Sequence, residues 1–247
     1  MRVLAFFVAA PLLAMPLAAC SFDDPESSTP GLPASGSGTT RTFAAADFTA
    51  VELSGADDID VRVGTGFSVR AEGPSDELDR IRIERDGTTL KVGRVRSHGI
   101  SWGSKNKVTV YVTMPRIAAA SLAGSGDLTI DRAEGQAFEG ALAGSGNLTI
   151  GALGVQSAKF ALAGTGDSKA AGLAKQLEVE IAGTGDVDAA ALKAEGADVS
   201  IAGTGSVRAQ VNGPAKINML GSGDVDLGPG ARCSTSKLGS GEVRCGN

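Results

Sequence analysis

A short glycine motif, Gly-Ser-Gly or Gly-Thr-Gly, recurs along the second half of the chain with nearly constant spacing. Its fullest form, LAGSGDLTI, begins at Leu122 and returns as LAGSGNLTI at Leu142. The first glycine of each copy stands at positions 124, 144, 164, 183, 203, 221 and 239, so the steps are 20, 20, 19, 20, 18 and 18 residues. A fixed period of this length indicates a solenoid, in which each repeat forms one turn and packs on its neighbours.

The residues between the motifs decide which kind of solenoid is expected. Each repeat consists of short runs of Ala, Val, Leu and Ile between glycines, without the helical spacing or the asparagine ladder of a leucine-rich repeat. Calcium-binding nonapeptide solenoids have about half this period. The pattern therefore predicts an all-β fold, a parallel β-helix (β-solenoid) with about 20 residues per turn over residues 117–247. Right-handed winding is expected from the chirality of parallel strand connections.

Equivalent positions of successive repeats should stack into columns. We expect the alanine before each of the first five motifs to fill a tight packing position. The Leu or Ile that opens each copy should form an inward apolar column: Leu122, Leu142, Leu162, Ile181, Ile201, Leu220 and Leu238. Glycine tolerates the positive φ that corners need. The expected corner glycines are Gly124, Gly126, Gly144, Gly146, Gly164, Gly166, Gly183, Gly185, Gly203, Gly205, Gly221, Gly223, Gly239 and Gly241.

Two polar columns accompany the corner. The hydroxyl column is Ser125, Ser145, Thr165, Thr184, Thr204, Ser222 and Ser240, and the acidic column is Asp127, Asn147, Asp167, Asp186, Ser206, Asp224 and Glu242. Stacked carboxylates could gather cations or read a regular polymer, but one carboxylate per turn does not supply the six or more oxygens that calcium takes. Asp and Asn after a turn also accept hydrogen bonds from nearby backbone N–H groups. We favour this structural role, and we predict no metal site.

Residues 42–116 show the period-two alternation of half-buried strands, as in the run IDVRV from Ile59 to Val63. We predict an N-terminal region of less regular β-strands here. The Asp-Gly pair at Asp86 indicates a hairpin turn. The run from Pro74 to Ile81 is the one segment that could form a helical turn.

The N-terminus has the features of an export signal. A charged start is followed by an apolar run from Val3 to Met15, too short to span a membrane. The sequence LAAC, ending at Cys20, resembles a bacterial lipobox, which implies a lipoprotein signal peptide at residues 1–19 and lipid attachment at Cys20. An ordinary secretory peptide with a chance cysteine is the alternative. Ser21 after the cysteine implies sorting to the outer membrane of a Gram-negative bacterium. Residues 20–41, rich in Pro, Gly, Ser and Thr, predict a flexible tether.

The other two of the three cysteines, Cys233 and Cys245, lie six residues before and six residues after Gly239. In an exported protein such an even pair predicts a disulfide. The bridge would close a short loop around the last motif. Zinc is a poor alternative, because two cysteines without nearby histidines do not complete a four-ligand site.

The segment between residues 96 and 107 is the largest departure from the strand and repeat patterns. It places Trp102 among the basic or titratable residues Arg96, His98, Lys105 and Lys107. Binding residues concentrate in such loops, so we predict a contact loop here. The alternative is that Trp102 covers the end of the solenoid.

Charge and composition exclude several function classes. Without Arg2 of the signal, 22 basic residues face 28 acidic ones, a net charge of −6, so we expect no nucleic-acid partner. The single histidine, the spacing of the carboxylates and the absence of a phosphate-binding or metal motif lead us to expect no catalytic residues and no cofactor.

As an ordered set, these segments resemble the head GIN domain family of bacterial envelope proteins. The residues that carry the likeness are FTAVELSGADDIDVRVGTG from Phe48, LDRIRIERDGTTLKV from Leu78, VTVYVTMP from Val108 and the LAGSGDLTI repeats. The resemblance covers residues 42–247 and implies a β-solenoid, an envelope location and often a lipid anchor. We therefore expect a non-catalytic, lipid-anchored protein that serves adhesion or envelope contact. Its partners would be the membrane, through the lipid, and an unidentified envelope protein or glycan. The alternative is a polysaccharide-binding or polysaccharide-degrading β-helix protein.

Overall fold

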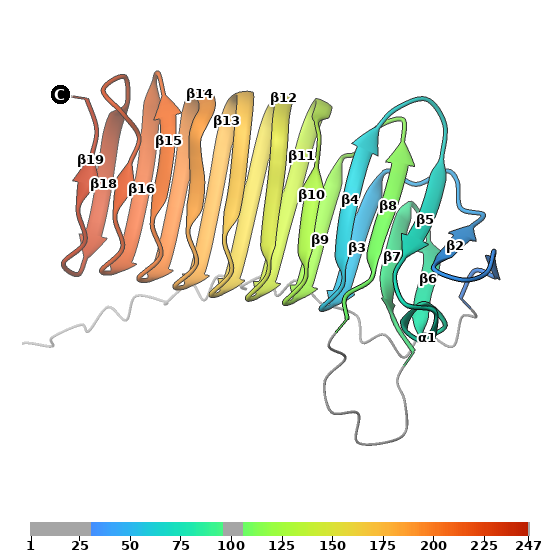
Figure 1. The fold of residues 1–247 in the computed structure, drawn as a ribbon. Helices are drawn as coiled ribbons and strands as arrows, with labels where there is room; N and C mark the ends of the chain where they lie inside the picture. Colours follow the sequence, from blue (N-terminus) through green and yellow to red (C-terminus); the bar gives the residue numbers. More distant parts are fainter. Residues whose placement is uncertain (1–30, 96–105, 247) are drawn as a thin grey trace, which may run out of the picture.

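The computed structural model describes residues 31–95 and 106–246, which form one continuous β-sheet wound into a solenoid, together with one short helix (Figure 1). The prediction of an all-β solenoid is confirmed. The molecule is elongated, with the first strands at one end and the last strands at the other. Within the described residues, no helix has the length and apolar content needed to cross a membrane.

The elements follow the chain in a simple order. The helix α1 spans Ser75–Leu78. The strands are β1 (Ala34–Ser35), β2 (Thr40–Phe43), β3 (Ala50–Gly55), β4 (Asp58–Val63), β5 (Ser68–Glu72), β6 (Ile81–Asp86), β7 (Thr89–Arg94), β8 (Thr109–Met114), β9 (Ala119–Gly124), β10 (Asp127–Ile130), β11 (Ala133–Gly144), β12 (Asn147–Gly164), β13 (Ser168–Gly183), β14 (Val187–Gly203), β15 (Val207–Val211), β16 (Pro214–Gly221), β17 (Val225–Asp226), β18 (Arg232–Leu238) and β19 (Val243–Arg244).

Each turn of the solenoid lies in parallel register on the turn before it. The strands β12, β13 and β14 each follow most of one turn, and the glycine motifs form the corners between them. Leu142 pairs with Leu162, Leu162 with Ile181, and Ile181 with Ile201. These shifts of 20, 19 and 20 residues equal the spacing of the motifs, which confirms the predicted length of a turn. The handedness of the winding stays a prediction.

The core lies between the two faces of the flattened turns. Side chains alternate between the core and the solvent, as the period of a strand requires. The predicted apolar column is confirmed over five turns, where its members are at most 4% exposed: Leu122, Leu142, Leu162, Ile181 and Ile201.

The same prediction is wrong for the last two motifs. Leu220 is 58% exposed and Leu238 is 72% exposed. The motifs there lack the alanine before the first glycine, so the leucine moves into the outward position. Ile201 pairs with Met219, and Met219 pairs with Lys237, so these two residues continue the inward column.

The predicted packing role of the alanines is also wrong. Ala163, Ala182 and Ala202 are exposed on the outer face of the sheet. Each lies one residue after a core residue, so the alternation of the strand turns it outward. Together with Leu220 and Leu238, which pair in the same column, they form an outer row of apolar side chains.

Both glycines of each motif lie too close to the preceding turn for a side chain, but their backbone conformations differ. The first glycine has a positive φ in every turn, for example +137° at Gly124 and +125° at Gly144, as predicted for a corner. The second glycine does not. A Cβ on Gly146 would lie 1.9 Å from the carbonyl oxygen of Gly126, so it is the close stacking of backbones that excludes a side chain.

The N-terminal strands begin the solenoid and then close its end. β3 and β4 pair in parallel with β9 and β10, so regular stacking starts upstream of residue 117. β7 and β8 form a further layer beneath β3 and β4, and the antiparallel strands β5 and β6 cover its edges. The predicted hairpin at Asp86 joins β6 to β7, and the predicted helical turn is α1.

Part of the segment expected to be a flexible tether belongs to this closed end. β1 pairs with β2, β2 pairs with β5, and the backbone N–H of Leu32 donates to the carbonyl of Ile83 at 2.7 Å. The residues from Leu32 to Arg41 therefore pack on the folded region.

One core position carries a hydroxyl. Ser168 is 1% exposed, and its side chain has no hydrogen-bond partner among the described residues. Its neighbours in the same column are Leu148 and Val187. Because an unpaired buried hydroxyl is costly and valine suits this column, we expect Ser168→Val to raise the free energy of unfolding by roughly 1–2 kcal/mol in urea denaturation. Ser200→Val, on the exposed face of β14, serves as the control and should change it by less than about 0.5 kcal/mol. A loss of stability in Ser168→Val would contradict the assignment.

Candidate interaction surfaces

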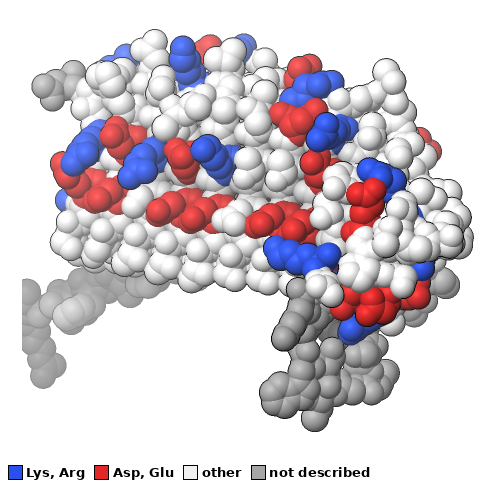
Figure 2. Space-filling view, in the orientation of Figure 1, with Lys and Arg blue, Asp and Glu red and all other residues white. Residues whose placement is uncertain are grey.

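The acidic column runs along the solenoid as an exposed row (Figure 2). Its carboxylates accept hydrogen bonds from the backbone of the next turn. Asp167 Oδ1 accepts from Asp186 N at 2.9 Å, Asp186 Oδ1 from Ser206 N at 2.7 Å, and Asp224 Oδ1 from Glu242 N at 2.8 Å. The column therefore ties successive turns together. No group of three or more potential metal ligands occurs within residues 31–95 and 106–246.

A second charged row lies one outward position further along the same face (Figure 2). Its members alternate in sign from turn to turn: Lys169, Asp188, Arg208, Asp226 and Arg244. Opposite charges in adjacent strands attract, and like charges would repel. This alternation favours the register of the solenoid and leaves little net charge on the row.

Most of the predicted contact loop lies outside the described residues, namely Arg96, His98, Trp102 and Lys105. Lys107 is described. Its ammonium donates to Asp58 Oδ1 at 2.9 Å and lies 3.8 Å from Asp127 Oδ2. The hydrogen bond with Asp58 raises the pKa of Lys107, so this lysine is held at the start of the acidic column.

The strands on either side of the predicted contact loop are described. β7 precedes it and β8 follows it, and these strands lie beneath β3 and β4, which are joined by a glycine corner at Gly55. The two strands that flank the predicted loop therefore belong to the closed end of the solenoid.

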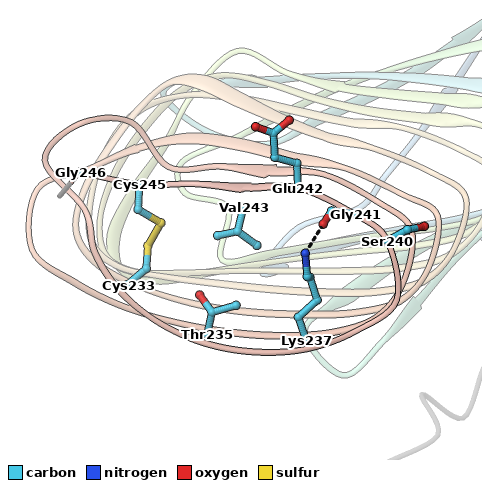
Figure 3. Close-up of a pocket in the computed structure, with 9 residues that line it drawn as sticks. All are labelled: Cys233, Thr235, Lys237, Ser240, Gly241, Glu242, Val243, Cys245 and Gly246. Carbon is cyan, nitrogen blue, oxygen red and sulfur yellow. Dashed lines mark hydrogen bonds between the residues drawn. A yellow bond between two sulfur atoms is a disulfide. The ribbon is translucent and has the colours of Figure 1, made fainter.

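The opposite end is formed by a single turn with an unusual core. Cys233 and Cys245 are joined by a disulfide across this turn, and Lys237 Nζ donates to the carbonyl of Gly241 at 2.6 Å. Thr235 and Val243 lie between these two links, on facing strands (Figure 3). Together with Ser240, Glu242 and Gly246, these residues line a shallow open pocket. Four of the lining residues stand in register with apolar residues of the preceding turn: Cys233, Thr235, Lys237 and Val243.

Sequence reasoning located the disulfide pair at this end but missed the surface. The sequence signal for this surface is Lys237, a lysine at the position that Ile201 and Met219 occupy in the two preceding turns. The leucine of the motif stands one residue after Lys237, so the motif itself does not show that lysine replaces an apolar core residue here. The arrangement is suited to binding through strand edges and hydrogen bonds.

Comparisons with known proteins agree with this architecture. The family DUF2807, described as "Putative auto-transporter adhesin, head GIN domain", matches residues 47–228. None of the curated proteins compared with the chain matches it.

Solved structures show the same fold. A "putative adhesin" from Bacteroides fragilis NCTC 9343 has a TM-score of 0.77 and 22% identity, covering 85% of this chain and 98% of that one. A "putative lipid binding protein" from Parabacteroides distasonis ATCC 8503 has a TM-score of 0.66 and 19% identity, covering 86% and 98%. A "putative adhesin" from the same strain has a TM-score of 0.59 and 19% identity, covering 85% and 97%. The family match spans most of the chain and coincides with the solenoid and its closed end, so the protein belongs to the head GIN domain family.

Proposed function

We propose that this protein is a non-catalytic component of a Gram-negative cell envelope, anchored in the outer membrane by lipid at Cys20, which presents its solenoid for adhesion or envelope contact. The family description supports a role in adhesion. The LAAC sequence that ends at Cys20 supports the anchor.

The observation that carries the proposal is the position of the two ends of the fold. The described chain begins at the closed end, where Leu32 bonds to Ile83, and it finishes in β18 and β19 at the far end (Figure 1). An anchor at Cys20 would therefore attach the molecule by its closed end. The long faces and the far end would point away from the attachment.

The way in which the polar columns are used supports a non-catalytic role. Carboxylates of the acidic column accept backbone N–H groups, and the second charged row alternates in sign. These groups hold the turns together and give the surface a regular, nearly neutral pattern. Such a surface is suited to contact with a partner.

Lipid anchoring is tested in a Gram-negative host that expresses the full chain. We expect incorporation of labelled palmitate and recovery in the outer-membrane fraction, both lost in the Cys20→Ser variant because the thiol that carries the lipid is gone. Cys233→Ser, which leaves Cys20 in place, is the control for loss of a cysteine. Equal labelling of wild type and Cys20→Ser would overturn the anchor.

Adhesion is tested on the same cells. Wild-type cells should bind to spots of a glycan or protein array, and cells that express Cys20→Ser should bind less because the protein is no longer held at the surface. Turnover of an envelope polysaccharide by the purified chain would instead favour the enzymatic alternative.

A further inference from the structure

We propose that the C-terminal end of the solenoid docks on the same end of a second copy of this chain. The strands β18 and β19 pair on one side with β16 and β17. No described strand pairs with their other side. An unpaired edge presents free N–H and C=O groups that can pair with another chain.

Hydrogen bonds to the preceding turn show which groups face outward. Arg232 N donates to Gly213 O at 2.8 Å, while Glu242 O and Arg244 O accept from the preceding turn at 2.9 and 3.0 Å. Backbone directions alternate along a strand, so the residues between these direct their N–H and C=O groups to the open side. The residues concerned are Cys233, Thr235, Lys237 and Val243.

These open groups suit a two-fold axis. In antiparallel pairing centred on Thr235, that residue lies opposite Thr235 of the second copy, and Cys233 lies opposite Lys237. The disulfide and the bond from Lys237 to Gly241 place Val243 directly across the turn from Thr235 (Figure 3). One axis through both residues therefore pairs β18 with β18 and β19 with β19, as a self-complementary interface requires.

The side chains match about the same axis. On β19, Glu242 of one copy lies opposite Arg244 of the other, twice by symmetry. On β18, Leu238 lies opposite Arg232, whose aliphatic stem can cover a leucine that is 72% exposed in one copy. No two like charges stand opposite each other, which is the condition for favourable antiparallel pairing.

Lys237 selects this pairing over others. An inward lysine at a strand edge usually discourages association. In the proposed register the two lysines lie at opposite ends of the paired strands, and each ammonium remains bonded to the carbonyl of its own Gly241. A register shifted toward Leu238 would bring the two lysines together. At the closed end, the edges of β8 and β7 are not open for the same pairing, because β5 and β6 already pair with them.

The interface makes a second copy of this chain the partner in the proposed adhesive function. This step rests on anchoring at the closed end, because only then do the C-terminal ends face outward. Two cells that carry the protein would be joined by end-to-end contact between their solenoids. The docking surface itself is present whether or not the chain is anchored.

Charge exchange tests the interface on the detergent-solubilised full chain by analytical ultracentrifugation. We expect wild type to dimerise, and Glu242→Arg or Arg244→Glu alone to dimerise at least about tenfold more weakly, because each places like charges opposite each other. An equal mixture of the two variants should form a heterodimer. Each variant lacks the ion pair between residues 242 and 244 of its own chain. Dimerisation that returns in the mixture can therefore come only from contact between chains.

A proline variant separates docking from folding. The N–H of Val243 faces the open side, so Val243→Pro should keep the thermal unfolding of the single chain within a few degrees and abolish dimerisation. A wild type that stays monomeric up to about 100 µM, well above the Kd of a stable contact, would overturn the proposal. So would a mixture that stays monomeric. Labelling of Cys20 is measured separately, so a failed anchor and a failed interface give different results.

Discussion

Replacing Gly146 by alanine should lower the free energy of unfolding by about 3–5 kcal/mol, measured by urea denaturation. The new Cβ would lie 1.9 Å from Gly126 O and 2.9 Å from Leu122 Cδ2. Neither neighbour can move away easily, because one is backbone of the turn below and the other is a fully buried core side chain. The turns would have to separate locally and lose the hydrogen bonds that join them.

A second glycine in the same turn provides the control. Gly154 lies within β12, and a Cβ there would have Glu134 Cγ as its nearest neighbour, at an ordinary 3.6 Å. Gly154→Ala should therefore be neutral or stabilise the fold by less than about 1 kcal/mol, because alanine restricts the unfolded chain. Equal losses in both variants would contradict the assignment of the loss at Gly146 to backbone stacking.

The regular part of the fold could be predicted because a solenoid repeats one local solution. Each turn must place an apolar residue inward and a small residue at the corner, so the period of the sequence equals the period of the structure. The register of Leu142 on Leu162 and of Ile181 on Ile201 follows directly. The reason for the second glycine could not be predicted, since its nearest neighbour belongs to another turn.

The ends of the solenoid were harder to predict, because the surroundings of a residue there do not recur in other turns. At the C-terminal end, the sequence motif predicts that Leu220 and Leu238 point inward. Strand pairing instead places Met219 and Lys237 at the inward positions. The one-residue difference reverses which face a side chain occupies. The repeat alone also does not reveal which described strands pair with β18 and on which side.

One corner at the closed end has a larger residue in the place of the second glycine of the motif. Asp57 stands in the first turn where later turns have their second glycine, one residue before the start of β4. The Asp57 side chain contacts the layer beneath, where Arg94 ends β7 and Val108 precedes β8. The carboxylate of Asp57, 2% exposed, turns inward and accepts from Arg94 Nε at 2.6 Å and Nη2 at 2.5 Å.

This buried pair joins the closed end to the first turn. Asp57 Oδ1 also accepts from Val108 N at 2.9 Å, and Arg94 makes a second ion pair with Glu77 of α1. The hydrogen bonds and the charge of Asp57, followed by the hydrogen bond and the charge of Glu77, raise the pKa of Arg94 well above its ordinary value, although burial acts to lower it. The guanidinium therefore stays charged and depends on both carboxylates.

Asp57→Asn should lower the free energy of unfolding by about 3 kcal/mol in urea denaturation, because it removes the charge that balances a largely buried guanidinium while keeping the shape of the side chain. Asp58→Asn is the matched control. Its carboxylate is 28% exposed and bonds to Lys107, which is 50% exposed, so the loss there should be below about 1 kcal/mol. In a double-mutant cycle, Arg94→Gln should cost much less in the Asp57→Asn background than in wild type. If the two losses add within about 0.5 kcal/mol, the ion pair between Asp57 and Arg94 does not contribute as proposed. Apolar contacts would then be what joins the closed end to the first turn.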